Sequence, residues 1–323
     1  MKRILILHTG GTISMSADQT TGAIRPSSEN PLHHYQHLFV DTVTLKTEDL
    51  FQLPSPHITL KEMTVIKERI EQAISEGETD GIVVTHGTDT LEETAYFLDL
   101  TLDSPIPVVI TGAMRPAEEI GSDGITNLQN AVWTAMSDGA VGKGVLVVMN
   151  EEIHTARYVT KTHTTNVATF RTPTFGPIGI VSKNNVLFFQ QLVALDHFPV
   201  KTITKKVPLL KAYAGMDGEM FDAVLAQDAD GLVIEALGAG NLPPAVLTSL
   251  QKLLDHAIPV VLVSRAFNGI AQDIYDYEGG GKQLKEAGVI FAPSLSGPKA
   301  RIKLLAVLEQ PFTHDEIEAI FAF

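Results

Sequence analysis

The chain has 323 residues, of which 44% are hydrophobic and 19% are charged, so it can bury a sizeable core and is too apolar for a disordered or coiled-coil protein. Its formal net charge of −14 disfavours nucleic acid or an anionic membrane as the main partner. It contains no cysteine, which excludes disulfides, thiolate catalysis and cysteine-bound metals.

The first segment is a short apolar run. Residues 4–7 follow a basic start and end at His8 and a glycine turn. A signal peptide needs a longer apolar region and a small-residue cleavage site, so this run is interpreted as a buried first strand and a cytoplasmic protein is expected. No run in the sequence approaches the roughly 20 apolar residues of a membrane span, so no membrane partner is expected.

Similar apolar runs recur with helical patterns between them, an alternation typical of a parallel α/β sheet with right-handed crossovers. Most of the runs lack polar alternation, as in strands that are covered on both faces. The predicted strands span residues 4–7, 81–85, 106–111, 145–149, 209–212, 232–235, 259–264 and 289–292. The first predicted helix starts at a capping box over 59–62 and ends at Gly77. Three further helices are predicted over 90–101, 124–138 and 243–256, and a last one starts at Thr313.

Residues 191–206 break this rhythm, because they lack strong helical periodicity and contain Pro199 and a lysine pair. We predict a larger N-terminal catalytic domain over residues 1–190, with a mostly parallel sheet and flanking helices. Residues 191–206 are the predicted linker, and residues 207–323 are predicted to form a smaller C-terminal α/β domain.

Three predicted strands end in clusters of hydroxyls and glycines, at residues 8–13, 85–90 and 111–116. Sites in open parallel sheets form just beyond the C-terminal strand ends. Each cluster alone could be an ordinary strand-to-helix turn, but together they indicate one shared pocket. Their glycines would let the backbone approach a ligand and direct N–H groups at a developing anion.

Threonine acts as a nucleophile when another group accepts its proton. Lys161, in a threonine-rich segment, is a candidate for that group, although a solvated surface lysine is the ordinary interpretation of such a residue. His86 could be a general base, but a structural hydrogen-bonding role is favoured.

Motifs for common cofactors are absent from the sequence. It has no phosphate-binding Gly-Lys-Ser/Thr loop, dinucleotide fingerprint, His-Glu-x-x-His zinc motif or Gly-x-Ser-x-Gly elbow. His33, His34 and His37 are close in sequence, yet no acid nearby completes a metal site, so they are interpreted as a solvated helix face. We expect neither cofactor nor metal.

The motifs at 9–13, 86–90 and 160–162 resemble the signatures of bacterial-type L-asparaginases. Further matches cover almost the whole chain, at residues 111–116, 122–124, 146–150, 240–241 and 264–265. The resemblance implies hydrolysis of L-asparagine to L-aspartate and ammonia, with possible minor glutaminase activity, by a homo-oligomer that is usually a tetramer.

The resemblance also implies roles for individual residues. Thr12 matches the nucleophile that forms the acyl-enzyme. Thr88 and Lys161 match residues that help deprotonate or orient the attacking group, and Asp89 matches the residue beside them that also binds the substrate α-ammonium. The implied substrate-binding residues are Gly11, Ser55, Gly87, Thr88, Asp89 and Ala113, together with Asn241 and Asp276 from a neighbouring subunit.

The sequence departs from the family pattern at three positions. Ala23 aligns with the family's loop tyrosine, Tyr35 is too far along to replace it, and Tyr275 is a candidate substitute. Asp276 stands where the family has glutamate, and Pro56 follows Ser55 where the family has glutamine or serine. Two alternatives keep the same fold: a non-catalytic amino-acid sensor, which the missing tyrosine suggests, and a subunit of a tRNA-dependent amidotransferase.

Overall fold

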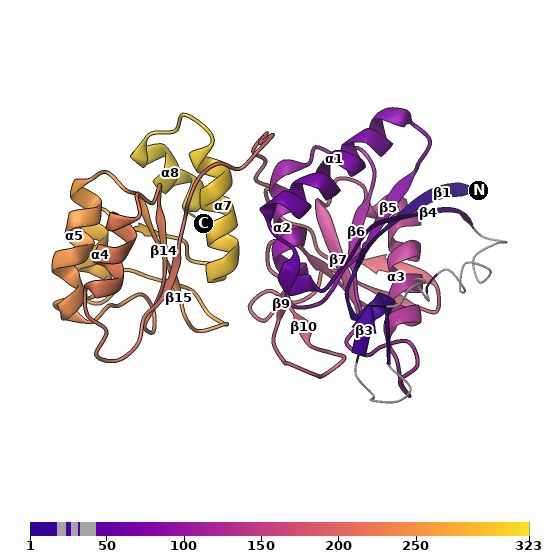
Figure 1. The fold of residues 1–323 in the computed structure, drawn as a ribbon, viewed down its shortest axis with the longest axis horizontal. Helices are drawn as coiled ribbons and strands as arrows, with labels where there is room; N and C mark the ends of the chain where they lie inside the picture. The colour runs from indigo at the N-terminus through magenta and orange to yellow at the C-terminus, as the bar shows by residue number, and fades with distance from the viewer. Residues whose placement is uncertain (18–23, 27–31, 33–42, 323) are drawn as a thin grey trace. The chain divides into compact units, whose positions relative to one another are not determined.

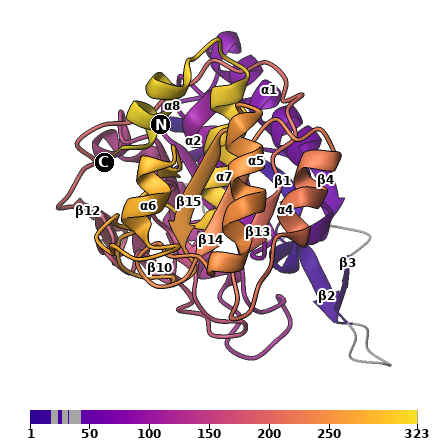
Figure 2. The ribbon, with the colours of Figure 1, turned by 90° about the vertical axis from the view of Figure 1, so that its left-hand side faces the viewer.

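The computed structural model describes residues 1–17, 24–26, 32 and 43–322. It divides into two compact units, Met1–Pro199 and Val200–Phe323, and each contains its own sheet (Figures 1 and 2). The division falls within the segment 191–206, and the finer assignment of that segment as a linker stays a prediction.

The first unit is built on an eight-stranded mixed sheet in the order β12-β11-β8-β7-β6-β5-β1-β4. Its parallel part comprises β1 (Lys2–Gly10), β4 (Val43–Leu53), β5 (Gly81–Thr85), β6 (Val108–Thr111) and β7 (Val145–Met149). The antiparallel part comprises β8 (Glu152–Thr155), β11 (Gly179–Ser182) and β12 (Asn185–Phe188). Every residue of β5, β6 and β7 is buried, which explains their uninterrupted apolar sequences.

Three helices connect the parallel strands of this unit: α1 (Leu60–Glu76), α2 (Leu91–Thr101) and α3 (Gly124–Met136). The predicted capping box of α1 is present, with Thr59 and Glu62 bonded reciprocally. The helix ends at Gly77, which takes the left-handed conformation at φ 67° that glycine adopts without a Cβ penalty. Short 3-10 turns occur at η1 (Thr12–Ser14), η3 (Ser55–His57) and η4 (Asp138–Ala140), and two-stranded ribbons pair β2 (Met15–Ala17) with β3 (Ile24–Pro26) and β9 (Thr160–Lys161) with β10 (Phe170–Arg171).

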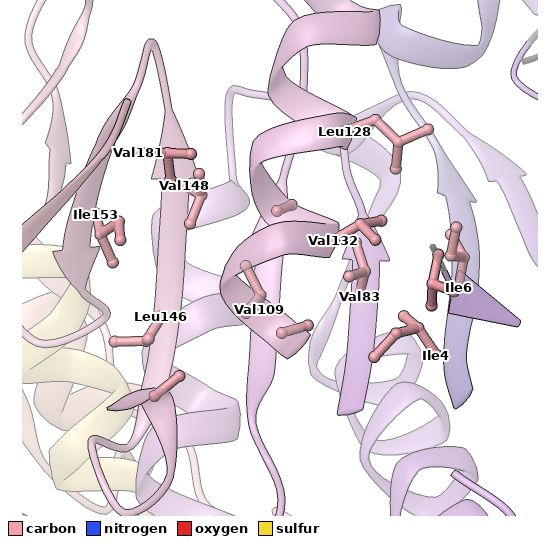
Figure 3. Close-up of a cluster of buried hydrophobic side chains, with 14 of the residues drawn as sticks. Ile4, Ile6, Val83, Val109, Leu128, Val132, Leu146, Val148, Ile153 and Val181 are labelled. Atoms are coloured by element: carbon pink, nitrogen blue, oxygen red, sulfur yellow. The ribbon is translucent and has the colours of Figure 1, made fainter. Parts of the chain in front are cut away.

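A core of aliphatic side chains joins α3 to the sheet (Figure 3). Leu128 and Val132 of α3 face Ile6, Val83 and Val109 on three neighbouring strands, and all five are at most 3% exposed. Burial of each such side chain contributes about 1.5–3 kcal/mol relative to exposure. This packing makes the sheet a rigid support for the turns that leave its C-terminal edge.

The second unit contains a parallel sheet in the order β13-β14-β15-β16. Its strands are β13 (Leu209–Lys211), β14 (Leu232–Ala236), β15 (Val260–Ser264) and β16 (Ile290–Phe291). Its helices are α4 (Glu219–Ala226), α5 (Leu247–Asp255, preceded by η5, Pro244–Val246), α6 (Gly281–Glu286), α7 (Gly297–Leu308) and α8 (His314–Phe321). The strands β14 and β15 lie between α4 and α5 on one side and α7 on the other (Figure 1).

The predicted class, α/β with a larger mostly parallel domain and a smaller α/β domain, is confirmed, with several differences in detail. The edge strand β4 was not predicted because it has no continuous apolar run; only Val43 is buried, and its other residues are partly buried or exposed. The antiparallel edge β8-β11-β12 was also not predicted; it starts where the chain reverses through Asn150 and Glu151, both at positive φ. Helices α4, α6 and α7 are further additions, and α3 ends at Met136 rather than at residue 138.

Candidate active site

The turns that follow β1 and β5 touch each other through glycines. A Cβ on Gly11 would lie 2.2 Å from the Cα of Gly87, and a Cβ on Gly87 would lie 2.7 Å from the Cβ of Ser55. Gly11 also has a φ of 80°, which disfavours other residues. Only glycine fits at either position without moving the backbone, so these two turns and Ser55 are in direct contact.

Thr12 begins the 3-10 turn that follows Gly11 and is half-buried. Two hydrogen bonds from Ser14 stabilise this turn. Its N–H and its hydroxyl both donate to the Gly11 carbonyl, each at 3.0 Å. The Gly11 N–H donates to Leu53 O at 3.0 Å, which ties the turn to the end of β4. Thr12 follows Gly11 and Thr88 follows Gly87, so both threonines lie next to the contact between the two glycines.

Ser55 links the end of β4 to the turn after β5. Its hydroxyl accepts a hydrogen bond from the Asp89 N–H at 3.1 Å, and its carbonyl accepts from the Thr90 hydroxyl at 2.8 Å. The residue is only 5% exposed. Its hydroxyl is thus fixed beside the turn that carries Thr88 and Asp89.

Lys161 reaches the same turn from a distant part of the chain. Its Nζ donates to Thr88 Oγ1 at 2.9 Å and to Asp89 Oδ1 at 2.7 Å. Thr88 is buried, the Lys161 side chain is 16% exposed, and the Asp89 side chain is 58% exposed. The structure thereby brings a hydroxyl, an amine and a carboxylate into one cluster that opens to solvent at the carboxylate.

The turn after β6 completes the arrangement. A Cβ on Gly112 would lie 2.5 Å from His86 O, so this turn abuts the one before Thr88, and Ala113 is fully buried. The Asp123 carboxylate accepts from the N–H groups of Met114 and Arg115 at 3.0–3.1 Å. Asp123 precedes α3 as predicted but makes no side-chain cap with it; its carboxylate holds this turn instead.

His86 is buried and bonded at both ring nitrogens, as its predicted structural role requires. Nδ1 lies 2.8 Å from the Gly87 carbonyl, which can only accept, so Nδ1 carries the proton. Nε2 then accepts from the Thr94 hydroxyl at 2.9 Å. Burial lowers the pKa of His86 to about 4 and outweighs the opposing effect of the Gly87 carbonyl, so the ring is neutral near pH 7.

Asn241 and Asp276 lie in the second unit. Asn241 Oδ1 accepts from the Gly281 N–H at 3.1 Å, and Asp276 pairs with Lys282 at 2.6 Å while its side chain stays 73% exposed. Tyr275, the candidate substitute for the loop tyrosine, is 44% exposed in the same unit. Entry of these residues into a neighbouring subunit's pocket stays a prediction.

Several sequence predictions fall outside the described residues: those on Ala23, Tyr35, His33, His34 and His37. Within residues 1–17, 24–26, 32 and 43–322, no group of three or more histidines and acids could hold a metal ion. In that same part of the chain, no helix combines the length and the apolar character needed to cross a bilayer.

Two polar residues at the site were missed from the sequence. Glu92, in the first turn of α2, accepts from the Thr160 hydroxyl at 3.1 Å and from the Lys161 N–H at 3.2 Å. Asn127 of α3 donates to the Gly112 carbonyl at 3.0 Å. In the sequence, both look like ordinary polar residues of a helix. Their partners in these hydrogen bonds lie 15 or more positions away along the chain, so no local pattern marks them.

The fold and the site together define a class: α/β hydrolases in which a turn at the C-terminal edge of a parallel sheet supplies a threonine hydroxyl and a carboxylate, and a lysine from a separate ribbon supplies an amine beside them. Residues 3–194 match the family model "Asparaginase, N-terminal", and residues 206–321 match "Glutaminase/Asparaginase C-terminal domain". The chain belongs to the asparaginase family.

Similar proteins match it along nearly their whole length. The chain is 36% identical over 307 residues to an L-asparaginase of Bacillus licheniformis, covering 95% of each. It is 40% identical over 325 residues to a probable L-asparaginase of Deinococcus radiodurans, covering 99% of this chain and 97% of that protein. The crystal structure of a probable cytoplasmic L-asparaginase from Campylobacter jejuni superimposes with a TM-score of 0.89 at 33% identity, covering 99% of both chains.

Proposed function

We propose that this protein is an L-asparaginase that hydrolyses L-asparagine to L-aspartate and ammonia with Thr12 as the nucleophile. The observation that carries the proposal is the pair of hydrogen bonds from Lys161 Nζ to Thr88 and Asp89, beside the contact of Gly11 with Gly87. The names of the similar proteins support the same substrate.

In the proposed reaction, the Thr12 hydroxyl attacks the side-chain amide carbon of asparagine. A C–O bond forms, the C–N bond breaks, and the hydroxyl proton leaves with the nitrogen as ammonia. Water then attacks the acyl-threonine ester, releasing aspartate and restoring the hydroxyl. Thr88 and Lys161 would relay the proton, and backbone N–H groups of the glycine turns would stabilise the tetrahedral oxyanion.

Substrate recognition follows from the same cluster. The partly exposed Asp89 carboxylate would bind the α-ammonium, and the Ser55 hydroxyl would bind the α-carboxylate. Gly11, Gly87 and Ala113 would contact the substrate through backbone atoms. Asn241 and Asp276 would enter from a neighbouring subunit, which requires a homo-oligomer. The description of the similar Campylobacter jejuni protein as cytoplasmic supports the same location for this enzyme.

The direct test is ammonia release from L-asparagine by the purified protein. Thr12→Ala should abolish turnover, whereas Thr12→Ser, which keeps a hydroxyl, should retain part of it. Turnover by Thr12→Ala at the wild-type rate would refute the nucleophile. L-glutamine is tested alongside, because one additional methylene changes binding by only about 1–3 kcal/mol.

The sensor alternative makes a different prediction for the unmodified protein. Calorimetry would then show binding of aspartate while no ammonia forms from asparagine. The amidotransferase alternative predicts binding of a partner subunit and of tRNA, and the formal net charge of −14 disfavours the binding of tRNA.

A further inference from the structure

The carboxylate of Glu92 joins two segments of the candidate site that are remote in sequence. Glu92 lies in the first turn of α2, directly after the turn that carries Thr88 and Asp89. Its Oε1 accepts hydrogen bonds from the Thr160 hydroxyl and from the Lys161 backbone N–H, at 3.1 and 3.2 Å. The turn that bears two members of the cluster thus continues into the first turn of α2, where the Glu92 carboxylate holds the backbone of the third.

The ribbon that carries Lys161 is short, and its further internal hydrogen bonds lie in the loop 162–169 that joins the two strands, on the far side of Lys161 from Thr160. Its strands β9 and β10 contain two residues each, with Lys161 paired to Phe170 and Thr160 paired to Arg171. An isolated two-stranded hairpin is marginally stable in water. Contacts from outside the ribbon must therefore set where Lys161 lies.

Two such contacts come from carboxylates on different elements. On the β10 side, Arg171 Nη1 donates to both carboxylate oxygens of Glu152 on β8 at 2.9 Å. On the β9 side the contact is Glu92. Of these two, only Glu92 bonds the backbone of Lys161 and belongs to the helix that continues from Asp89.

We propose that Glu92 is a positioning residue that keeps the Lys161 amine in register with Thr88 and Asp89, and thereby sets the rate of the chemical step. This inference rests on the proposed asparaginase function. Glu92 has no part in substrate contact; it acts through the backbone of Lys161 and the hydroxyl of Thr160.

The expected effect falls on turnover rather than on substrate binding, because the hydrogen bond that ties Ser55 to the Asp89 N–H does not involve Glu92 or Lys161. Misplacement of a catalytic group by 1 Å can cost about 10²-fold in rate. Glu92→Ala removes the acceptor and should lower kcat by about 10²-fold, with a much smaller change in KM. Glu92→Gln retains an acceptor oxygen on a side chain of the same length and should recover most of the lost kcat.

Glu93 provides the matched control, since it lies in the same helical turn and is also partly buried. Glu93→Ala removes an equal charge from the α2 N-terminus but leaves the hydrogen bonds of Glu92 to Thr160 and Lys161 intact, so its loss of kcat should be much smaller than that of Glu92→Ala. Thermal unfolding of all three variants shows whether they fold. Equal losses of kcat in Glu92→Ala and Glu93→Ala, a loss confined to KM, or a Glu92→Gln variant as slow as Glu92→Ala would each overturn the proposal.

A crystal structure of Glu92→Ala separates this inference from the proposed function. We expect the Lys161 amine to leave its positions 2.9 Å from Thr88 and 2.7 Å from Asp89. If the wild-type protein releases no ammonia but Lys161 moves in the variant, the function is wrong and the positioning role stands. If the wild-type protein is active and Lys161 stays in place, the positioning role is wrong.

Discussion

Gly11 and Gly87 are packed backbone to backbone, so closely that a Cβ on Gly11 would lie 2.2 Å from the Gly87 Cα. This contact joins the turns after β1 and β5. Thr12 and Thr88 are the next residues along the chain after the two glycines. A side chain at either glycine must push apart the two turns that form the site.

Gly11→Ala is therefore expected to abolish most activity. The methyl group meets backbone atoms that cannot move independently, and the φ of 80° adds strain of about 1–3 kcal/mol. Gly77→Ala is the control, since Gly77 has a φ of 67° but would place its Cβ in open space at the end of α1. It should lower the melting temperature and keep kcat/KM. Full activity in Gly11→Ala would contradict the close contact.

Lys161→Met should lower kcat by about 10²–10⁴-fold, the usual contribution of a positioned acid or base. Methionine approximates the length of the side chain but cannot donate to Thr88 or bear charge. Lys143→Met, which removes an amine near the Phe188 ring, serves as the control and should keep turnover. Steady-state kinetics with asparagine measure both, and equal rates for the two variants would remove Lys161 from the mechanism.

Asp123→Ala should lower both stability and activity, because the N–H groups of Met114 and Arg115 lose their shared acceptor. A fully buried donor left without an acceptor costs about 1–3 kcal/mol, and because Met114 and Arg115 are partly buried we expect a loss of stability at the lower end of that range. The turn that carries Ala113 should loosen as a result. Asp138→Ala, at a side chain that is 91% exposed, should change neither quantity much. Urea unfolding and kcat/KM are the measurements, and an Asp123→Ala variant as stable as Asp138→Ala would refute the clamp.

The buried His86 ring should make stability depend on pH. Its pKa is about 4 in the folded protein against an ordinary value of 6.5, because burial disfavours the charged ring. Between pH 6.5 and about pH 4, the unfolded chain therefore carries a proton on this ring and the folded protein does not. The contribution of His86 to folding stability is complete above pH 6.5 and is lost as the pH falls to about 4.

His86→Gln tests this dependence by urea unfolding at several pH values. The wild-type protein should lose stability more steeply than the variant between pH 6.5 and pH 4, and NMR should show the His86 ring neutral throughout the upper part of that range. Identical slopes for the two proteins would mean that His86 titrates normally.

The proposed sharing of sites between subunits predicts complementation. Thr12→Ala and Asp276→Ala should each reduce activity as pure proteins. Suppose that one subunit supplies Thr12 and its neighbour supplies Asp276. Random pairing of equal amounts of the two variants then gives about half mixed pairs, and each mixed pair has one intact site out of two. About a quarter of the wild-type activity should therefore return. Mixing without any recovery would show that both residues act within one subunit or that Asp276 is not needed.

Local signals in the sequence were sufficient to predict much of the fold. The apolar runs at 81–85 and 145–149 are β5 and β7, because strands buried on both faces need continuous apolar side chains. The capping boxes at Thr59 and Thr313 predicted the starts of α1 and α8, since a cap involves only residues within one helical turn. The glycine and hydroxyl clusters after β1, β5 and β6 indicated which edge of the sheet would carry the site.

Tertiary structure alone decided which of those groups meet. The sequence made Lys161 a candidate, but its contact with Thr88, 73 positions away, depends on how the β9–β10 ribbon docks against α2. The carboxylates of Glu92 and Asp123 look like ordinary residues at helix starts and instead bind other segments. The physical reason is that caps and periodicity are satisfied within a few residues, whereas a polar group that reaches across the fold is placed by the packing of whole elements.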